Sequence, residues 1–221
     1  MTDNSDDLNS PKPISLMLDR PVPSFVARST KGSISSENYR GKWLILFSHP
    51  ADFTPVCTSE FIALQRSIKE FERRDCQLLG LSVDSIYSHV AWVSNIKEKF
   101  DIEISFPIIE DISMAIATAY GMLDSTSTST ATVRAVFFID PQGILRANIN
   151  YPMQVGRSVA EIIRTLSALQ TVDEQSMSAP EGWQVGEKLV PMAPTTIEEA
   201  NLVKSVPENV EWYYNDTSKL N

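Results

Sequence analysis

The sequence predicts an α/β fold, a sandwich in which helices pack on a largely parallel sheet that is closed by an antiparallel hairpin. Two observations support this prediction. Short apolar runs such as Trp43–Phe47 and Gln77–Asp84 alternate with segments whose apolar residues recur at helical spacing. Later in the chain, two apolar runs are separated only by Asp140-Pro141-Gln142-Gly143, and this order of residues is typical of a β-turn between antiparallel strands.

The expected elements follow one another with short connections. At the start, short apolar pieces flank a Lys31-Gly32 turn, which predicts an N-terminal hairpin or short strands within residues 14–42. A continuous helix is expected over 55–73, because the apolar residues from Phe61 to Phe71 have helical spacing. The remaining elements are strands or extended pieces at 43–47, 77–84, 107–109, 133–140 and 144–150, and helices at 88–99, 112–120, 158–169 and 196–204.

Three segments of different composition predict the domain organisation. Residues 1–13 are polar and acidic, and we expect a mobile N-terminal arm. Residues 14–170 carry the α/β pattern and form one domain. Residues 171–221 are punctuated by prolines, yet they hold four aromatic residues, Trp183, Trp212, Tyr213 and Tyr214. Aromatic residues are scarce in disordered segments, so we expect this C-terminal arm to pack on its own domain or to dimerise with a second subunit.

Composition disfavours several classes of partner in general, and only a local basic patch would offset the overall charge. The 221 residues include 19 basic and 28 acidic ones, which gives a net charge of −9. This charge disfavours nucleic acid and anionic membrane surfaces, and no apolar run is long enough to span a bilayer. The acidic N-terminus lacks the features of a secretory signal. Two cysteines cannot form a disulfide framework, which fits a reducing compartment, and the expected location is the cytoplasm.

The stretch from Ser48 to Phe61 places a cysteine at a strand-to-helix junction. Thr54 is a suitable N-cap, and Pro55 fits the first helical position. Cys57 then lies in the first turn, where backbone N–H groups have no helical partner and the helix dipole favours an anion. The nucleophilic thiolate is therefore favoured over the thiol. The Thr54 hydroxyl is close enough in sequence to hydrogen-bond this thiolate or an oxygen bound beside it.

The same stretch resembles the active-site signature of the peroxiredoxins, which are thiol peroxidases on a thioredoxin-like fold. The motif Pro50-x-x-Phe53-Thr54-x-x-Cys57 carries the resemblance, and its extension from Ser48-His49 to Glu60 is similar to the one-Cys, or peroxiredoxin-six, subgroup. Further matches are Ser82-Val83-Asp84-Ser85, His89-x-x-Trp92, Arg134-x-x-Phe137-x-Ile139-Asp140, Tyr151-Pro152, Gly156-Arg157 and Trp183-x-x-Gly186. The resemblance implies a thioredoxin-like sandwich with an N-terminal hairpin and a C-terminal arm.

The resemblance also implies a role for individual residues. Cys57 would be the peroxidatic nucleophile, which a peroxide converts to a sulfenic acid. Thr54 would align the peroxide, Pro50 would shield the thiolate from water, and Arg134 would stabilise the developing negative charge. The substrate pocket or its surroundings would also include His49, Glu60 and Arg157.

The other cysteine and the histidines leave alternatives open. Cys76 opens a strand, and a structural role is expected for it, with a resolving role as the alternative. His49 and His89 together with Cys57 match no usual zinc spacing, so neither a metal nor a cofactor is expected. His89 lies on an apolar helix face, where packing or hydrogen bonding is the expected role.

The resemblance implies a thiol-specific peroxidase that reduces hydrogen peroxide and alkyl hydroperoxides. An external thiol reductant would regenerate it: a thioredoxin-like protein, a glutaredoxin-like protein or glutathione. A homodimer, or a higher oligomer such as a decamer, is expected. The alternative function is a peroxide sensor or holdase-like protein that oxidation of Cys57 switches.

Two other activities are disfavoured by the same sequence. Some members of the subgroup carry a phospholipase-like Gly-x-Ser-x-Gly motif, but the corresponding stretch here, Arg40–Leu44, has no serine. General thiol–disulfide exchange on this fold usually requires Cys-x-x-Cys, and Ser59-Glu60 stand where the second cysteine would fall.

Overall fold

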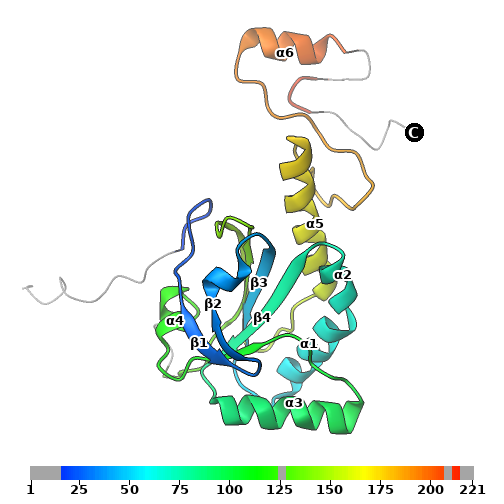
Figure 1. Ribbon diagram of the computed structural model, residues 1–221. Coiled ribbons are helices and arrows are strands. Elements are labelled where there is room, and N and C mark those ends of the chain that lie inside the picture. Colours follow the sequence, from blue (N-terminus) through cyan, green and yellow to red (C-terminus); the bar gives the residue numbers. More distant parts are fainter. Residues whose placement is uncertain (1–15, 124–127, 207–210, 215–221) are drawn as a thin grey trace, which may run out of the picture. The chain divides into compact units, whose positions relative to one another are not determined.

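The structure is a computed structural model that describes residues 16–123, 128–206 and 211–214. The chain divides into two compact units, one that reaches to Val159 and one that begins at Ala160. The first unit contains a seven-stranded mixed sheet in the order β2-β1-β5-β4-β3-β6-β7, which confirms the predicted α/β class (Figure 1). The strands are β1 (Val26–Ser29), β2 (Gly32–Ser35), β3 (Trp43–Ser48), β4 (Cys76–Ser82), β5 (Ile108–Glu110), β6 (Arg134–Ile139) and β7 (Leu145–Tyr151).

Three parallel strands, β3, β4 and β5, form the centre of the sheet. All residues of β3 are buried, as expected for a central strand that is covered on both faces. Its register with β4 runs from Trp43 opposite Cys76 to Ser48 opposite Leu81. β3 therefore carries the chain from the end of the sheet that holds Cys76 to the opposite end, where the loop to Cys57 begins.

Two hairpins flank the parallel strands, as predicted. β1 and β2 are joined through Thr30-Lys31, and Gly32 there takes a φ of 99°, which glycine adopts without strain. β6 and β7 are joined by the turn that begins at Asp140. Its carboxylate accepts hydrogen bonds from the backbone N–H groups of Gln142 and Ile144, both at 2.9 Å. The side chain of the first turn residue thus stabilises the reversal that closes the sheet.

The connecting helices are the 3-10 helix η1 (Ser36–Tyr39), α1 (Pro55–Arg66), α2 (Ile68–Glu72), α3 (Ile86–Phe100) and α4 (Ala115–Ala119). The prediction of one continuous helix over 55–73 is wrong. Ser67 separates α1 from α2 because it leaves the helical conformation, with φ −97° and ψ 7°. α3 begins before the predicted residue 88 because the Ser85 hydroxyl caps it, accepting a hydrogen bond from the Ser88 N–H at 3.3 Å.

The helix predicted over 112–120 begins only at Ala115. Met114 has a φ of 58°, which lies outside the right-handed helical region. The buried carboxylate of Asp111 accepts hydrogen bonds from the N–H groups of Ile116 at 3.3 Å and Ala117 at 2.7 Å. Asp111 therefore caps α4 from outside the helix, and this contact sets a later start than apolar spacing alone indicates.

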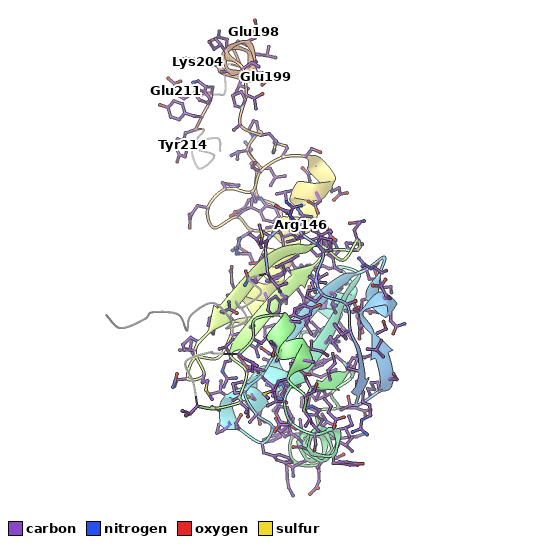
Figure 2. The ribbon with its side chains drawn as sticks, turned by 90° about the vertical axis from the view of Figure 1, so that its left-hand side faces the viewer. Arg146, Glu198, Glu199, Lys204, Glu211 and Tyr214 are labelled. Carbon is purple, nitrogen blue, oxygen red and sulfur yellow. The ribbon has the colours of Figure 1, made fainter. Side chains whose placement is uncertain are left out.

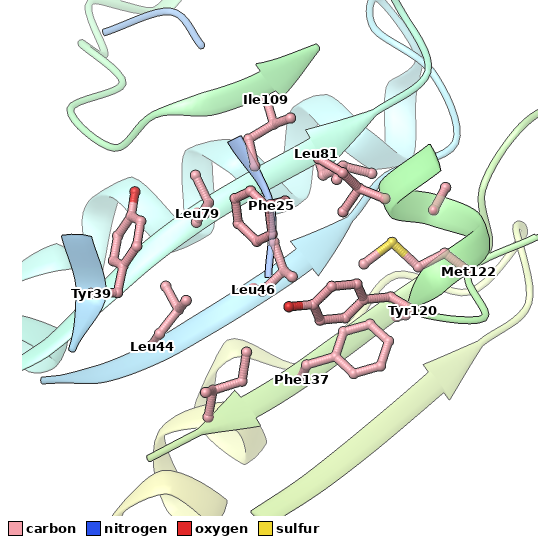
Figure 3. Close-up of a cluster of buried hydrophobic side chains, with 14 of the residues drawn as sticks. Phe25, Tyr39, Leu44, Leu46, Leu79, Leu81, Ile109, Tyr120, Met122 and Phe137 are labelled. Carbon is pink, nitrogen blue, oxygen red and sulfur yellow. The ribbon is translucent and has the colours of Figure 1, made fainter. Parts of the chain in front are cut away.

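The sheet separates two apolar layers. One layer is centred on Tyr120 and Phe137, whose rings lie 5.4 Å apart. Figure 3 shows its members Phe25, Tyr39, Leu44, Leu46, Leu79, Leu81, Ile109, Tyr120, Met122 and Phe137. In the other layer, Phe47 of β3 packs against Phe61 of α1 with 5.4 Å between ring centroids. This contact fixes α1 on the face of β3 that continues to His49.

The second unit holds nearly all of α5 (Val159–Gln175) and the whole of α6 (Ile197–Lys204). α5 runs beyond the predicted end at residue 169. Between the helices, Ser178 and Val190 exchange backbone hydrogen bonds of 2.8 Å. The indole N–H of the buried Trp183 donates to the Glu187 carbonyl at 3.0 Å. This part of the chain is therefore ordered by its own backbone and aromatic contacts.

α6 is a surface helix whose N-terminus is capped by side chains. The Thr196 hydroxyl accepts from the Glu199 N–H at 3.1 Å, and the Glu199 carboxylate accepts from the Thr196 N–H at 3.2 Å, which forms a capping box. Lys204 lies at the other end of the helix and pairs with Glu211 at 3.2 Å (Figure 2). No side chain of α6 is buried, and Ile197 is 82% exposed.

Two sequence expectations concern membranes and the N-terminus. No helix in the described ranges is both long and apolar enough to cross a membrane. The mobile arm predicted for residues 1–13 lies outside the described residues. The apolar residues at 16–18 lie in a turn-rich segment, so the first strand of the hairpin region is β1.

Candidate active site

A short loop joins β3 to α1 and places Cys57 in the first turn of the helix. Pro55 is the first helical residue and Thr54 occupies the N-cap position, as predicted. Phe53 reverses the chain just before the helix with a φ of 54°, which is unfavourable for a residue that has a Cβ atom. The Cys57 amide belongs to the helix N-terminus, where N–H groups have no acceptor within the helix. The Cys57 side chain is fully buried.

The side chain of Thr54 does not cap the helix, contrary to the sequence prediction. Its hydroxyl donates a hydrogen bond to the Ala51 carbonyl at 2.9 Å, within the loop. A hydroxyl has a single proton to donate, so Thr54 Oγ1 does not donate to the thiolate in this geometry. Its lone pairs remain able to accept a hydrogen bond from a bound O–H group. Pro50, in the same loop, is buried and has no N–H to offer.

The sheet register brings Arg134 to the same end of the molecule. β6 pairs antiparallel with β3, and Phe47 lies opposite Val136. Two residues further along the same face, this register places His49 opposite Arg134. The β3 face that packs on α1 therefore ends in an imidazole and a guanidinium, contributed by segments far apart in the sequence.

Arg134 contacts the sulfur directly. Its Nη1 lies 3.3 Å from Cys57 Sγ and 2.8 Å from Glu60 Oε2. Its Nε donates to the Met153 carbonyl at 2.8 Å, which fixes the plane of the guanidinium. Arg134 is only 3% exposed, so water screens its charge weakly and the cation favours an anionic sulfur.

Glu60 and Arg157 hold Arg134 in place. The Arg157 guanidinium binds Glu60 bidentately, with Nε 2.9 Å from Oε1 and Nη2 2.8 Å from Oε2, and the Arg157 backbone N–H adds a third bond of 2.7 Å. Burial alone would raise the pKa of Glu60, but Arg157, helped by Arg134, holds this pKa below its usual value. Arg157 Nη1 is anchored to the carbonyls of Ser48 and Ala135 at 2.7 and 2.9 Å. The charged groups of the network are thus held by several hydrogen bonds from within the protein.

A second polar cluster lies beside the first. Asp52 Oδ1 is 2.8 Å from His49 Nε2, Asp52 Oδ2 is 2.8 Å from His89 Nδ1, and His89 Nε2 is 3.0 Å from the Ile109 carbonyl oxygen. Burial lowers the pKa of His49, although Asp52 opposes the shift. Histidine and aspartate, the residue types of this cluster, also bind metals. Here each carboxylate oxygen meets one imidazole at hydrogen-bond distance, so the geometry is that of a proton-sharing network.

Comparison with known proteins identifies the family to which this site belongs. Residues 18–148 match the family model described as the AhpC/TSA family. The chain belongs to this family of peroxiredoxins. The peroxiredoxin of Aquifex aeolicus is 48% identical, with 89% of this chain and 94% of that protein covered. Peroxiredoxin 2 of Caldanaerobacter subterraneus is 49% identical, with 93% and 91% covered. Peroxiredoxins are thiol-dependent peroxidases, and this chain is an enzyme of that class.

Two solved structures of peroxiredoxins resemble this one closely. The yeast mitochondrial 1-Cys peroxiredoxin superposes with a TM-score of 0.77 at 36% identity, covering 85% of this chain and 92% of that chain. A cysteine-to-serine mutant of peroxiredoxin 6 of Arenicola marina gives 0.79 at 33% identity, covering 90% and 96%. Both likenesses agree with the thioredoxin-like sandwich that the sequence predicts.

The second cysteine of this peroxiredoxin lies at the opposite end of the sheet. Cys76 is paired with Trp43 at the start of β3, whereas Cys57 follows the end of β3. At about 3.3 Å per residue, the length of β3 alone separates the two ends by roughly 15 Å, well beyond the ~7 Å between Cα atoms that a disulfide allows. Both cysteines are free thiols, and burial raises the pKa of Cys76 to about 12.

The residues predicted for the peroxiredoxin site lie in three groups in the structure. Direct hydrogen bonds and charge contacts join four of them, Cys57, Glu60, Arg134 and Arg157. Thr54 and Pro50 lie in the loop before α1, and His49 belongs to the neighbouring histidine cluster. Sequence reasoning missed Asp52 and the carbonyl of Met153. The position of Asp52 three residues after His49 was the available signal, because residues this close in a loop can bond to each other.

Proposed function

We propose that this chain is a one-Cys peroxiredoxin that reduces hydrogen peroxide and alkyl hydroperoxides through a sulfenic acid at Cys57. The observation that carries the proposal is the 3.3 Å contact between Arg134 Nη1 and Cys57 Sγ at the N-terminus of α1. A buried cation and unpaired helix amides around one sulfur are the groups that stabilise a thiolate and the negative charge of an attacked peroxide.

The proposed reaction is a nucleophilic displacement on oxygen. The Cys57 thiolate attacks the terminal oxygen of the peroxide, an S–O bond forms and the O–O bond breaks. Sulfur is oxidised by two electrons, and the other oxygen leaves as hydroxide or alkoxide, which takes up a proton to give water or alcohol. Thr54 Oγ1 accepts the hydrogen bond of the peroxide O–H and aligns it, and Pro50 keeps water from the sulfur. Arg134 binds the charge that spreads over the two oxygens.

The sulfenic acid has to be reduced by an external thiol. Cys76 is too far from Cys57 to form a disulfide without rearrangement of the sheet, and no other cysteine is present in the chain. We therefore propose a thioredoxin-like protein, a glutaredoxin-like protein or glutathione as the reductant. A structural neighbour supports this assignment, because the yeast 1-Cys peroxiredoxin is described as resolved via glutathione/thioredoxin systems. The two free thiols fit the reducing cytoplasm.

Two exposed features support a homodimer, with a higher oligomer such as a decamer as the alternative. β7 has a strand neighbour on only one side in the described sheet, and an edge strand is a template for pairing with another chain. In the C-terminal arm, α6 exposes Ile197 and Leu202, at 82% and 71%. We propose that the arm covers these side chains by contact with a second copy.

The function is tested by stopped-flow oxidation with a stoichiometric amount of peroxide, followed by turnover with a thiol reductant. Wild type and Cys76→Ser should consume peroxide at similar rates and should cycle with the reductant. Cys57→Ser should lose the fast reaction, because a serine hydroxyl is not ionised at neutral pH. Fast consumption by Cys57→Ser would refute the assignment. A wild-type protein that oxidises once and does not cycle would be a peroxide sensor instead of a peroxidase.

A further inference from the structure

The turn between β7 and α5 borders the buried cluster around Cys57 but is itself exposed. It covers residues 152–156, all of which are exposed to solvent. The Val155 N–H donates to the Pro152 carbonyl at 3.1 Å, which closes the reversal and leaves Met153 at its corner. The reaction proposed above uses only the backbone of this turn, through the carbonyl that binds Arg134, and assigns nothing to its side chains.

Two hydrogen bonds hold this turn against the groups that surround the sulfur. The Met153 carbonyl accepts from Arg134 Nε at 2.8 Å. The same guanidinium contacts Cys57 Sγ through its Nη1, at 3.3 Å. At the end of the turn, the Arg157 N–H donates to Glu60 Oε1 at 2.7 Å. The turn is therefore fixed beside the cation that contacts the sulfur.

Gly156 brings the same turn against the first turn of α1. A Cβ atom at this position would lie 3.3 Å from Cγ1 of Val56 and 4.0 Å from Cγ of Glu60. A side chain here would therefore push Val56 away, and glycine allows the two segments to approach closely. Val56 directly precedes Cys57, so the exposed turn and the start of the helix meet beside the reactive residue.

The burial of the charged groups decides where the substituent of an organic hydroperoxide can lie. Cys57, Arg134 and Arg157 are all buried, and a bulky group could lie among them only by displacing packed atoms. In the proposed displacement, Arg134 binds both peroxide oxygens, including the one that carries the substituent. The substituent then extends from Arg134 toward solvent, along the turn at 152–156.

Met153 and Val155 give this border of the site an apolar surface. Their side chains are 45% and 48% exposed, so each has apolar area that a bound group can cover. Covering apolar area stabilises a complex roughly in proportion to the area removed from water. Hydrogen peroxide has no substituent and cannot make such a contact. The two side chains therefore distinguish organic hydroperoxides from hydrogen peroxide, although the buried groups treat the O–O bond of both alike.

We propose that Met153 and Val155 are specificity-determining residues that contact the substituent of the hydroperoxide and favour bulky apolar groups, such as tertiary alkyl and aryl groups. This proposal rests on the proposed peroxidase function. The covalent step is unchanged, because the sulfur of Cys57 takes the terminal oxygen and the alcohol leaves with its substituent beside the turn. The contact is present before and during the reaction, so it raises the second-order rate constant of Cys57 oxidation.

Stopped-flow oxidation of the reduced, full-length protein by hydrogen peroxide, tert-butyl hydroperoxide and cumene hydroperoxide tests this contact. The measured quantity is the rate constant with each organic hydroperoxide divided by that with hydrogen peroxide. Met153→Gln and Val155→Thr replace apolar side chains by polar ones of similar size and keep the backbone that binds Arg134. We expect each to lower the cumene hydroperoxide ratio by about threefold and the double variant by about tenfold, because a half-exposed contact is weaker than an enclosed pocket.

Two further variants serve as controls. Met153→Leu keeps an apolar side chain of similar volume, and its ratio should stay within about twofold of wild type. Met17→Gln makes the same chemical change as Met153→Gln at another exposed methionine. Met17 lies two residues before Asp19, whose N–H donates to the Leu145 carbonyl at the start of β7, whereas the turn follows the end of β7. Met17→Gln should therefore leave the ratio unchanged.

Two results would overturn the specificity role. One is a double variant whose ratio equals that of wild type. The other is an equal loss of rate with all three hydroperoxides, which would show that the turn acts on Arg134 and not on the substituent. If one single variant does not fold, the other carries the same comparison. A wild-type protein that reacts through Cys57 with an unaltered ratio in the variants rejects this role alone, whereas fast consumption by Cys57→Ser rejects the peroxidase assignment and this role with it.

Discussion

The two cysteines of this chain have the same burial and opposite surroundings. Cys57 is 0% exposed and Cys76 is 5% exposed, so access to water does not distinguish them. Cys57 begins a helix and lies 3.3 Å from a buried guanidinium. Cys76 begins a strand, and burial raises the pKa of its thiol to about 12. We infer from this contrast that the nearby charges and amide groups, and not exposure, would decide which of the two thiols reacts.

The largest expected effect is in chemical modification. A thiol with a pKa of about 12 is thiolate in only about one molecule in 10⁵ at neutral pH, so Cys76 should alkylate about 10³-fold more slowly than an ordinary cysteine. The rate at Cys76 should rise as the pH approaches 12, because the thiolate is the reactive form. Iodoacetamide labelling followed by mass spectrometry measures both sites. Equal labelling of the two cysteines in the native protein, with denatured protein as the control, would contradict the difference between their surroundings.

Removal of the cation from Cys57 should have the next largest effect. Arg134→Gln keeps a side chain of similar length but loses the charge next to the sulfur. We expect Cys57 to oxidise about 10²-fold more slowly, the usual effect of losing one charge-stabilising donor. Stopped-flow fluorescence with hydrogen peroxide measures the rate. Arg73→Gln is a matched control, because Arg73 pairs with Glu70 on the surface. A rate unchanged by Arg134→Gln in a folded protein would remove Arg134 from the site.

Thr54 provides a smaller and more specific test. Thr54→Val removes the acceptor oxygen with little change in shape, and we expect about a tenfold loss of rate, the effect of one hydrogen bond of about 1.4 kcal/mol. Thr54→Ser retains the oxygen and should stay within about threefold of wild type. The same stopped-flow assay compares the two. If both variants react equally slowly, the methyl group and not the oxygen matters.

The smallest effect is expected at the other end of the sheet. Cys76→Ala should leave the rate of peroxide turnover unchanged and should lower the free energy of unfolding by about 1 kcal/mol, because a small buried side chain is lost. Denaturant titration and steady-state assays measure the two quantities. Non-reducing electrophoresis sharpens the result. A disulfide that forms on peroxide treatment in the wild type but not in this variant would show that Cys76 reaches Cys57 after all.

The local part of the site could be predicted from the sequence because it is contiguous. Pro55 starts the helix, and Cys57 lies in its first turn, as residue preferences at helix ends indicate. The side chain of Thr54 was predicted wrongly, because the Ala51 carbonyl in the loop competes with the helix amides for its hydroxyl. Residue preferences at helix ends describe positions along the chain. The hydrogen-bond partner of a hydroxyl also depends on acceptors and donors that come close only in the folded loop.

The distant part of the site required the family resemblance. Arg134 and Arg157 meet Glu60 because β6, the loop after β7 and α1 converge at one end of the sheet, and no periodicity in the sequence indicates that convergence. Asp52 was missed for a related reason. A single acidic residue in a loop is normally solvated, and only the folded structure shows that two imidazoles bury it.

We expect the charges around Cys57 to make the stability of the protein depend on its redox state. Arg134 and Arg157 provide two fixed cations and Glu60 one fixed anion, so a thiolate at Cys57 brings the buried cluster to neutrality. A sulfenic acid is uncharged and leaves one positive charge uncompensated, whereas a sulfinate restores the balance. Calorimetry should therefore find the lowest melting temperature for the sulfenic form. In the proposed cycle, the oxidised enzyme would then be the form that opens most easily, at the moment when a reductant has to reach a sulfur that is otherwise buried.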